Sequence, residues 1–165
     1  MKTILVTGSG GFIGQNLCNA LRRHGEFEVL EFTRRHEAET LPSLARRADV
    51  VFHLAGVNRS MDEKEFTTGN VDLTRRLCES LAATGRRTPL VFSSSVQAEL
   101  DNLYGCSKRQ AEDAVLRYHN QEGAPVYIYR FPNVFGKWSR PNYNTVVATF
   151  CHNISRGLPV QVSSR

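Results

Sequence analysis

The sequence predicts an α/β protein in which helices cover both faces of a doubly wound parallel sheet, and two observations lead to this fold. Short apolar runs such as Ile4, Leu5 and Val6 alternate with longer amphipathic segments along the chain. Runs of this kind are typical of strands buried on both faces, which belong to parallel sheets with right-handed helical crossovers. The second observation is a glycine-rich turn directly after the first run, which is typical of the Rossmann arrangement.

Ten elements are predicted in strict alternation. Apolar runs, the first of which ends in a glycine, predict five strands over residues 2–7, 27–33, 50–54, 90–94 and 126–130. Apolar residues at helical spacing, with Gly25 as the first stop signal, predict five helices over residues 12–24, 41–48, 62–83, 104–120 and 142–155. No repeat or linker divides the chain, so residues 1–165 are expected to form one domain.

The composition is that of an ordinary globular domain. The chain has 165 residues, 41% hydrophobic and 22% charged, with a net charge of +5, which excludes collagen-like and disordered chains. No apolar run is long enough to cross a membrane, and the short run near the N-terminus does not make a signal peptide. The four scattered cysteines form no CxxC pair, so we expect a cytoplasmic protein with no metal and no membrane partner.

Positive charge is concentrated in arginine doublets, which raise the question of a nucleic-acid surface. The doublets are Arg22-Arg23, Arg34-Arg35, Arg46-Arg47, Arg75-Arg76 and Arg86-Arg87. No aromatic residues lie between them, as a base-stacking surface requires, and three doublets fall near predicted helix ends, where cations suit the helix dipole. We therefore expect no nucleic-acid partner.

The glycine-rich turn is the first candidate site. It lies between the first predicted strand and the first predicted helix, where Gly8 allows a tight turn and Gly14 allows close packing of the helix. The helix N-terminus offers unpaired N–H groups to the phosphates of a dinucleotide. The residues expected against the pyrophosphate are Gly8, Gly10, Gly11, Phe12 and Ile13. The alternative is a plain turn from strand to helix.

The end of the second predicted strand selects the cofactor. An acidic residue at that end would bind the adenosine ribose and favour NAD, whereas here Thr33, Arg34 and Arg35 follow the strand. These residues suit a 2′-phosphate, so we expect NADP, used as NADPH. The alternative is that the two arginines form a solvated loop pair.

Ser95, Tyr104 and Lys108 form the second candidate site. Tyr104 and Lys108 are four residues apart at the start of a predicted helix, so they lie on one face, and Ser95 ends the fourth strand. A nearby ammonium favours the phenolate, so we expect a lowered Tyr104 pKa and proton exchange near neutrality. The Ser95 hydroxyl can bind a substrate carbonyl. Tyr-x-x-x-Lys alone occurs often by chance, but its place after this glycine turn and Ser-Ser-Ser strand end favours a catalytic role.

These motifs resemble those of the extended short-chain dehydrogenase/reductases, the NAD-dependent epimerase/dehydratase family. The matching segments are TGSGGFIG at 7–14, HLAG at 53–56, FSSS at 92–95, YGCSK at 104–108 and RFPNVFG at 130–136. The resemblance implies that Tyr104 is the acid/base, that Ser95 polarises the carbonyl and that Lys108 orients the nicotinamide ribose. It implies further cofactor contacts at Leu54, Ala55, Gly56 and Phe131. Asn70 is expected to be structural or near the adenine, and His53 to be a core residue.

A narrower resemblance, over nearly the whole chain, is to capsular polysaccharide enzymes that make precursors of UDP-N-acetyl-L-fucosamine. HLAGVNR at 53–59 and YRFPNVFGKWSRPNYNTVVATFC at 129–151 carry it. Those enzymes join an NADPH-dependent reductase domain to a C-terminal cupin domain. The resemblance implies that the chain is cut before its C-terminal substrate subdomain, that a cupin follows in the full-length protein, and that the protein is a homodimer. The extra strand that usually precedes HLAG is missing or vestigial here, which leaves the adenine contact open.

The expected reaction is reduction of the 4-keto group of a UDP-2-acetamido-2,6-dideoxy-hexulose. Sugar 4,6-dehydratases of this superfamily carry an Asp-Glu pair where this chain has Val96 and Gln97. A nucleotide-sugar 4-epimerase with tightly bound NAD is one alternative, and a dinucleotide sensor without catalysis is another. The candidate substrate contacts are Arg59, Asn133 and Lys137, with Arg140 beside Lys137 as a second contact for the diphosphate; surface loop charges are the alternative for these two cations.

Overall fold

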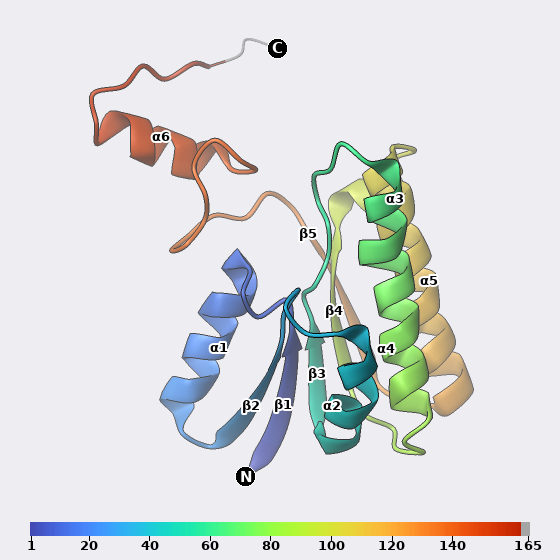
Figure 1. The fold of residues 1–165 in the computed structure, drawn as a ribbon. Coiled ribbons are helices and arrows are strands. Elements are labelled where there is room, and N and C mark those ends of the chain that lie inside the picture. Colours follow the sequence, from blue (N-terminus) through green and yellow to red (C-terminus); the bar gives the residue numbers. More distant parts are fainter. Residues whose placement is uncertain (163–165) are drawn as a thin grey trace. The chain divides into compact units, whose positions relative to one another are not determined.

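The computed structural model describes residues 1–162 and divides into two units, Met1–Phe131 and Pro132–Arg165. The first unit is built on a five-stranded parallel sheet (Figure 1). Its strands are β1 (Lys2–Thr7), β2 (Phe27–Phe32), β3 (Val50–His53), β4 (Leu90–Ser95) and β5 (Val126–Phe131). The predicted Rossmann-type α/β fold is confirmed.

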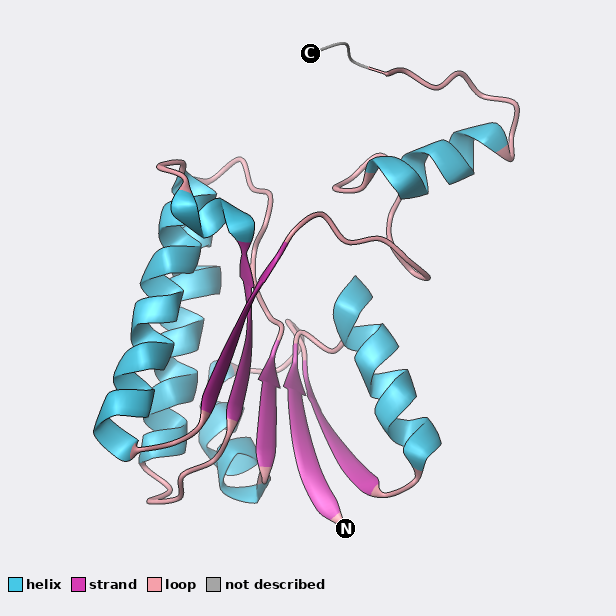
Figure 2. Ribbon diagram, turned by 180° about the vertical axis from the view of Figure 1, so that it is seen from behind, coloured by secondary structure: helices cyan, strands magenta, loops and turns pink. Residues whose placement is uncertain are grey.

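Helices cover both faces of this sheet, as Figure 2 shows from behind. On one face α1 (Phe12–His24) packs Cys18 against Ile4 and Val6 of β1. On the other face lie α2 (Leu41–Arg47), α4 (Leu73–Ala82) and α5 (Leu103–Glu122). Side chains alternate between the faces of a strand, so Leu5 of β1 joins this second, larger core. No helix in residues 1–162 is both long and apolar enough to cross a membrane.

In the strand order β2-β1-β3-β4-β5 all strands are parallel, but the connections turn back across the sheet at β1. The connection from β1 leads outward to β2, and the next connection returns past β1 to β3 on its other side. In such sheets a crevice opens at the carboxyl ends of the strands on either side of this switch point, here β1 and β3. The connection from β2 to β3 holds η1 (Ala38–Thr40) and α2 but no strand, as the sequence predicts.

Two predicted helices differ from the structure. The single helix expected over 62–83 is three segments, α3 (Glu63–Phe66), a π-helix η2 (Thr67–Asp72) and α4. In the second unit, α6 (Val146–Ile154) begins later than the predicted residue 142. Asn142 has a positive φ of 56°, which a right-handed helix excludes. The helix starts only after Thr145.

Several arginines of the doublets form ion pairs on the surface of the first unit. Arg22 pairs with Glu31, Arg47 with Glu28 and Arg76 with Glu39. These pairs join helices α1, α2 and α4 to neighbouring elements. The arrangement is the one expected for structural cations, and it agrees with the absence of aromatic residues between the doublets.

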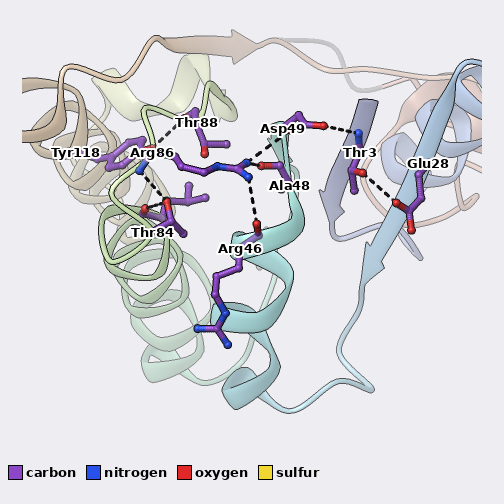
Figure 3. Close-up of polar contacts among 10 residues, drawn as sticks. Thr3, Glu28, Arg46, Ala48, Asp49, Thr84, Arg86, Thr88 and Tyr118 are labelled. Carbon is purple, nitrogen blue, oxygen red and sulfur yellow. Dashed lines mark hydrogen bonds and ion pairs between the residues drawn. The ribbon is translucent and has the colours of Figure 1, made fainter. Parts of the chain in front are cut away.

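Arg86 joins three segments at the amino-terminal edge of the sheet (Figure 3). Its guanidinium donates to the carbonyl oxygens of Arg46 and Ala48 and lies 3.7 Å from the Asp49 carboxylate. These carbonyls belong to the end of α2, where backbone acceptors lack partners inside the helix. Asp49 in turn accepts a hydrogen bond of 2.8 Å from the Thr3 amide. Arg86 therefore ties the end of α2 to β1 and β3.

Replacing Arg86 by alanine is expected to lower the free energy of unfolding by about 1–3 kcal/mol, because two carbonyl acceptors lose their donor. Urea unfolding followed by circular dichroism measures this change. The matched control is Arg87→Ala, which removes the exposed neighbouring arginine. Equal stability of the two variants would contradict the capping role of Arg86.

Candidate active site

The glycine-rich turn between β1 and α1 is as tight as predicted. Gly8 has a φ of +70°, and a Cβ atom there would lie 2.6 Å from the Ala55 nitrogen. A Cβ on Gly14 would lie 2.2 Å from the Gly8 oxygen, so helix α1 packs directly on the turn. Both distances are shorter than any atomic contact allows. The turn therefore requires glycine at these two positions.

Helix α1 presents an open N-terminus beside this turn. Its N-cap is Gly11, no side chain caps the first turn, and no acidic residue lies there. The backbone N–H groups of Phe12 and Ile13, together with the helix dipole, are thus available to an anion. The turn and the helix start can hold a pyrophosphate, as the sequence predicts.

Thr33, directly after β2, faces the turn. Its methyl group would lie 3.6 Å from a Cβ placed on Gly10. Arg34 and Arg35 are exposed and form no ion pair within residues 1–162. The nearest acidic residue on β2, Glu31, is paired with Arg22, which lowers the pKa of its carboxyl. No carboxylate follows Phe32 at the strand end, where one that binds a ribose would be expected.

The loop after β3 runs along the carboxyl edge of the sheet and holds Leu54, Ala55 and Gly56. The Asn70 side chain fixes this loop, since its Oδ1 accepts from the Val57 N–H at 2.7 Å and its Nδ2 donates to the Val57 oxygen at 2.9 Å. Asn70 is buried in η2 and also donates to the Ser107 hydroxyl. The π-helical turn thereby brings a polar side chain into the core at the cofactor edge.

Tyr104 and Lys108 lie in the first turns of α5, which begins at this edge. Asn102 caps the helix by accepting from the Gly105 N–H at 2.7 Å. A Cβ on Gly105 would lie 2.1 Å from the Gln97 oxygen, so glycine lets α5 pack on the turn after β4. That turn follows Ser95, whose side chain acts on the Tyr104 phenol and lowers its pKa. The structure thus brings Ser95 and Tyr104 together.

Burial raises the pKa of the Tyr104 phenol, and the polar Ser95 side chain opposes this rise. The predicted lowering by Lys108 is wrong in this structure, because desolvation of the phenolate outweighs other effects. The ammonium of Lys108 is also engaged elsewhere, as it donates to the Ser93 oxygen at 2.6 Å. Tyr104 is therefore protonated at neutral pH.

Lys108 is buried with 5% exposure and lies 4.6 Å from the centre of the Phe92 ring. Burial lowers the pKa of its ammonium to about 8, while the Glu112 carboxylate one turn later favours the charged form. Most of the Lys108 population is still charged at pH 7. A Cβ on Gly56 would lie 3.7 Å from its Nζ, so the ammonium sits against the loop after β3.

The Glu112 cluster is a feature that sequence reasoning missed. Glu112 accepts hydrogen bonds from Arg130 of β5 and from the Ser94 hydroxyl, and these lower the pKa of its carboxyl against the effect of burial. Arg130 also pairs with Glu99. The i,i+4 spacing from Lys108 was the available signal, but a charged residue at that spacing usually marks a solvated helix face.

The remaining predicted site residues are placed as follows. Phe131 ends β5 opposite Ser95 in the sheet register, at the same carboxyl edge. Arg59 is exposed on the loop after β3. Asn133 and Lys137 belong to the second unit, where the Lys137 ammonium lies 4.5 Å from the Trp138 ring centre. Their place beside the first unit stays a prediction.

A turn that can hold phosphates, with a buried lysine and a protonated tyrosine at the same sheet edge, defines a dinucleotide-binding protein of the Rossmann type. Residues 4–164 match the NAD dependent epimerase/dehydratase family. The chain belongs to that family. Within residues 1–162, no three His, Cys, Asp or Glu side chains gather as a metal site would require.

Individual relatives agree with this assignment. The chain is 54% identical to UDP-2-acetamido-2,6-beta-L-arabino-hexul-4-ose reductase of Pseudomonas aeruginosa, over 98% of this chain and 43% of that protein. It is 40% identical to the solved capsular polysaccharide assembling protein CapF from Staphylococcus aureus, with a TM-score of 0.85, over 99% of this chain and 43% of CapF. MoeE5, solved with UDP-glucuronic acid and NAD, is 26% identical, with a TM-score of 0.79, over 96% and 63% of the two chains. The chain thus spans less than half the length of the first two proteins.

Replacing Gly8 by alanine is expected to lower the free energy of unfolding by more than about 3 kcal/mol, because the added methyl collides with the Ala55 backbone. Gly25→Ala is the matched control, since Gly25 has the same φ of +70° but nothing within 4 Å of its Cβ. That variant should lose only about 1 kcal/mol from backbone strain. Chemical denaturation measures both changes, and a Gly8 variant no weaker than the Gly25 variant would refute the packing of this turn.

Proposed function

We propose that the protein uses NADPH to reduce the 4-keto group of a UDP-2-acetamido-2,6-dideoxy-hexulose in nucleotide-sugar biosynthesis. The observation that carries this proposal is the arrangement of Ser95, Tyr104 and Lys108 at the carboxyl edge of the sheet, beside the glycine-rich turn. The 54% identity to a hexul-4-ose reductase supports the substrate class. The 40% identity to CapF, a capsular polysaccharide assembling protein, supports the capsule as the polysaccharide that this chain helps to make.

The residues of the edge fit a dinucleotide. Gly8 keeps the turn free of side chains, and the uncapped start of α1 offers N–H groups for the pyrophosphate. When bound there, NADPH supplies the hydride. Gly56 lets the loop after β3 lie directly against the Lys108 ammonium, so this lysine is held at the edge where the nicotinamide ribose is expected.

The protein's own side chains handle the proton. Tyr104 is protonated at neutral pH because burial raises its pKa, so it can donate a proton to the carbonyl oxygen as the alcohol forms. The mostly charged Lys108 ammonium, which donates to the Ser93 oxygen, is the group proposed to orient the nicotinamide ribose. Ser95, whose side chain acts on the Tyr104 phenol, is placed to hold the carbonyl oxygen within reach of the phenol.

NADPH is favoured over NADH by the residues after β2. Thr33 faces the turn, two exposed arginines follow it, and the Glu31 carboxylate is engaged by Arg22. A 2′-phosphate carries two negative charges that Arg34 and Arg35 can bind through paired N–H donors. The same residues argue against a 4-epimerase that retains NAD.

The substrate and the assembly follow from the same proposal. Arg59, Asn133 and Lys137 are the proposed contacts of the UDP-sugar, with Arg140 as a second cation for the diphosphate. Elimination of water is disfavoured because Val96 and Gln97 offer no carboxylate after Ser95. We further propose a homodimer in the cytoplasm and a cupin domain that follows residue 165 in the full-length protein, since the relatives are more than twice as long as this chain.

Tyr104→Phe in the complete protein should lower kcat/KM for a 4-keto UDP-sugar by at least about 100-fold, because the proton donor is lost. NADPH affinity should change less than about twofold, since the ring remains. Tyr127→Phe, on an exposed tyrosine of β5, is the matched control and should keep full activity. Unchanged turnover by the Tyr104 variant would defeat the mechanism.

The pair of changes Arg34→Asp and Arg35→Asp should reduce the preference for NADPH over NADH by about 10- to 100-fold, because the phosphate loses two cations and meets two carboxylates. Fluorescence titration with each coenzyme measures the ratio of dissociation constants. Arg23→Asp together with Arg87→Asp, at two exposed arginines outside the glycine-rich turn, makes the same change in net charge and is the matched control. Equal affinity of the unmodified protein for both coenzymes would refute the NADPH assignment.

A further inference from the structure

A buried polar chain runs beneath the candidate site, and the proposed chemistry does not use it. Its centre is His53 at the end of β3, which has no exposed surface. The His53 Nδ1 lies 2.6 Å from the Thr7 hydroxyl, and the Nε2 lies 2.9 Å from the Thr74 hydroxyl. The Thr7 hydroxyl oxygen also accepts from the Ala55 N–H at 3.3 Å. The chain therefore joins the strand before the glycine-rich turn to the loop after β3.

The donor and the acceptor of every hydrogen bond in this polar chain follow from the groups at its two ends. The Thr74 hydroxyl bonds to the Asn70 carbonyl oxygen, which can only accept, so the single hydroxyl proton of Thr74 is used there. Thr74 must then accept a proton from His53 Nε2. In the neutral ring Nδ1 is consequently an acceptor, and it takes the Thr7 hydroxyl proton. Thr7 is left to accept from Ala55, as observed.

Both ends of this polar chain of hydrogen bonds meet the loop after β3. One end holds the Ala55 N–H, and the other end is Asn70, whose side chain forms two hydrogen bonds with the Val57 backbone. The backbone of Gly56 lies between these two anchors. A Cβ there would lie 2.9 Å from the Asn70 Oδ1 and 3.7 Å from the Lys108 Nζ. One connected set of hydrogen bonds therefore fixes both sides of the loop against Lys108.

The groups around His53 favour its neutral form. Thr7 faces it from β1, Thr74 from α4, the Phe92 ring stacks on it from β4 at 5.5 Å, and the Lys108 ammonium acts on it from α5. Burial, with a smaller effect from Lys108, lowers the pKa of His53 to about 3. A protonated Nδ1 would also break the chain, since it could no longer accept from Thr7. The hydrogen bonds of the polar chain therefore require the neutral His53 ring with its proton on Nε2.

We propose that His53 is a positioning residue, which as its Nε2–H tautomer holds the backbone of residues 54–57 in the shape that receives the nicotinamide half of the dinucleotide. This inference rests on the proposed function. It assigns a purpose to a histidine that the sequence indicates only as a core residue. His53 itself touches neither Tyr104 nor Ser95 through any described hydrogen bond, so its effect on the site passes through the loop.

The tautomer is tested first, by ring nitrogen NMR of the unmodified, ¹⁵N-labelled protein. We expect the His53 Nδ1 resonance in the unprotonated range and a proton on Nε2, with no titration between about pH 5 and pH 8. A proton on Nδ1, or titration in this interval, would overturn the inference. This measurement needs neither a variant nor a cofactor.

The role of the polar chain is tested with Thr74→Val, which keeps the shape of the side chain but removes both hydrogen bonds of the Thr74 hydroxyl. We expect the dissociation constant and KM for NADPH to rise about 5- to 10-fold and kcat to change less than about twofold, because Ser95 and Tyr104 are untouched. Thr74→Ser restores the hydroxyl and should restore affinity. Thr88→Val is the matched control, since Thr88 is buried and its hydroxyl has no partner in residues 1–162.

The outcomes separate the two proposals. If the unmodified protein binds no NADPH, the proposed function and this inference fail together. If it binds NADPH but Thr74→Val has the affinity of Thr88→Val, only the inference fails. A lower kcat with unchanged NADPH affinity would show a loss of folded protein alone and would likewise overturn the positioning role.

Discussion

Close packing around the backbone of residues 54–57 is the constraint that holds the candidate site together. Two elements approach this loop more closely than a side chain would allow. Gly8 of the glycine-rich turn lies against the Ala55 backbone, and Gly69 of η2 lies against the Val57 side chain. A shift of this loop would therefore move the glycine-rich turn and η2 with it, while Lys108 of α5 lies beside Gly56 at ordinary contact distance. The glycines allow this close packing, and the hydrogen bonds of the polar chain through His53 fix the position of the loop.

The sheet order explains why these elements meet. Because the chain crosses back over β1 between β2 and β3, the carboxyl ends of β1 and β3 are neighbours at the switch point. The glycine-rich turn follows β1, and the 54–57 loop follows β3. β4 and β5 then extend the sheet on the side of Lys108, whose helix connects them. The glycine-rich turn and Tyr104 are thus brought to one edge by strand order, while the exact distances at this edge depend on the buried polar contacts.

Much of this arrangement could be predicted from the sequence, because apolar runs and glycine turns are local signals. The five strands lie within one or two residues of their predicted bounds, and the missing strand before HLAG is missing in the structure. The π-helix could not be predicted, since helical spacing of apolar residues does not reveal where Asn70 turns inward to hydrogen-bond Val57. The direction of the Tyr104 pKa was wrong for a similar reason, because spacing shows that Lys108 shares a face but not that its ammonium bonds to Ser93.

The central claim is that this edge holds NADPH and passes its hydride to a sugar carbonyl. The most direct test supplies the complete protein with a 4-keto UDP-sugar and NADPH carrying deuterium at both hydrogen positions of nicotinamide C4, followed by mass spectrometry and NMR of the sugar. The account predicts one deuterium at sugar C4 for each NADPH oxidised. A sugar product without deuterium, or conversion without oxidation of NADPH, would contradict it.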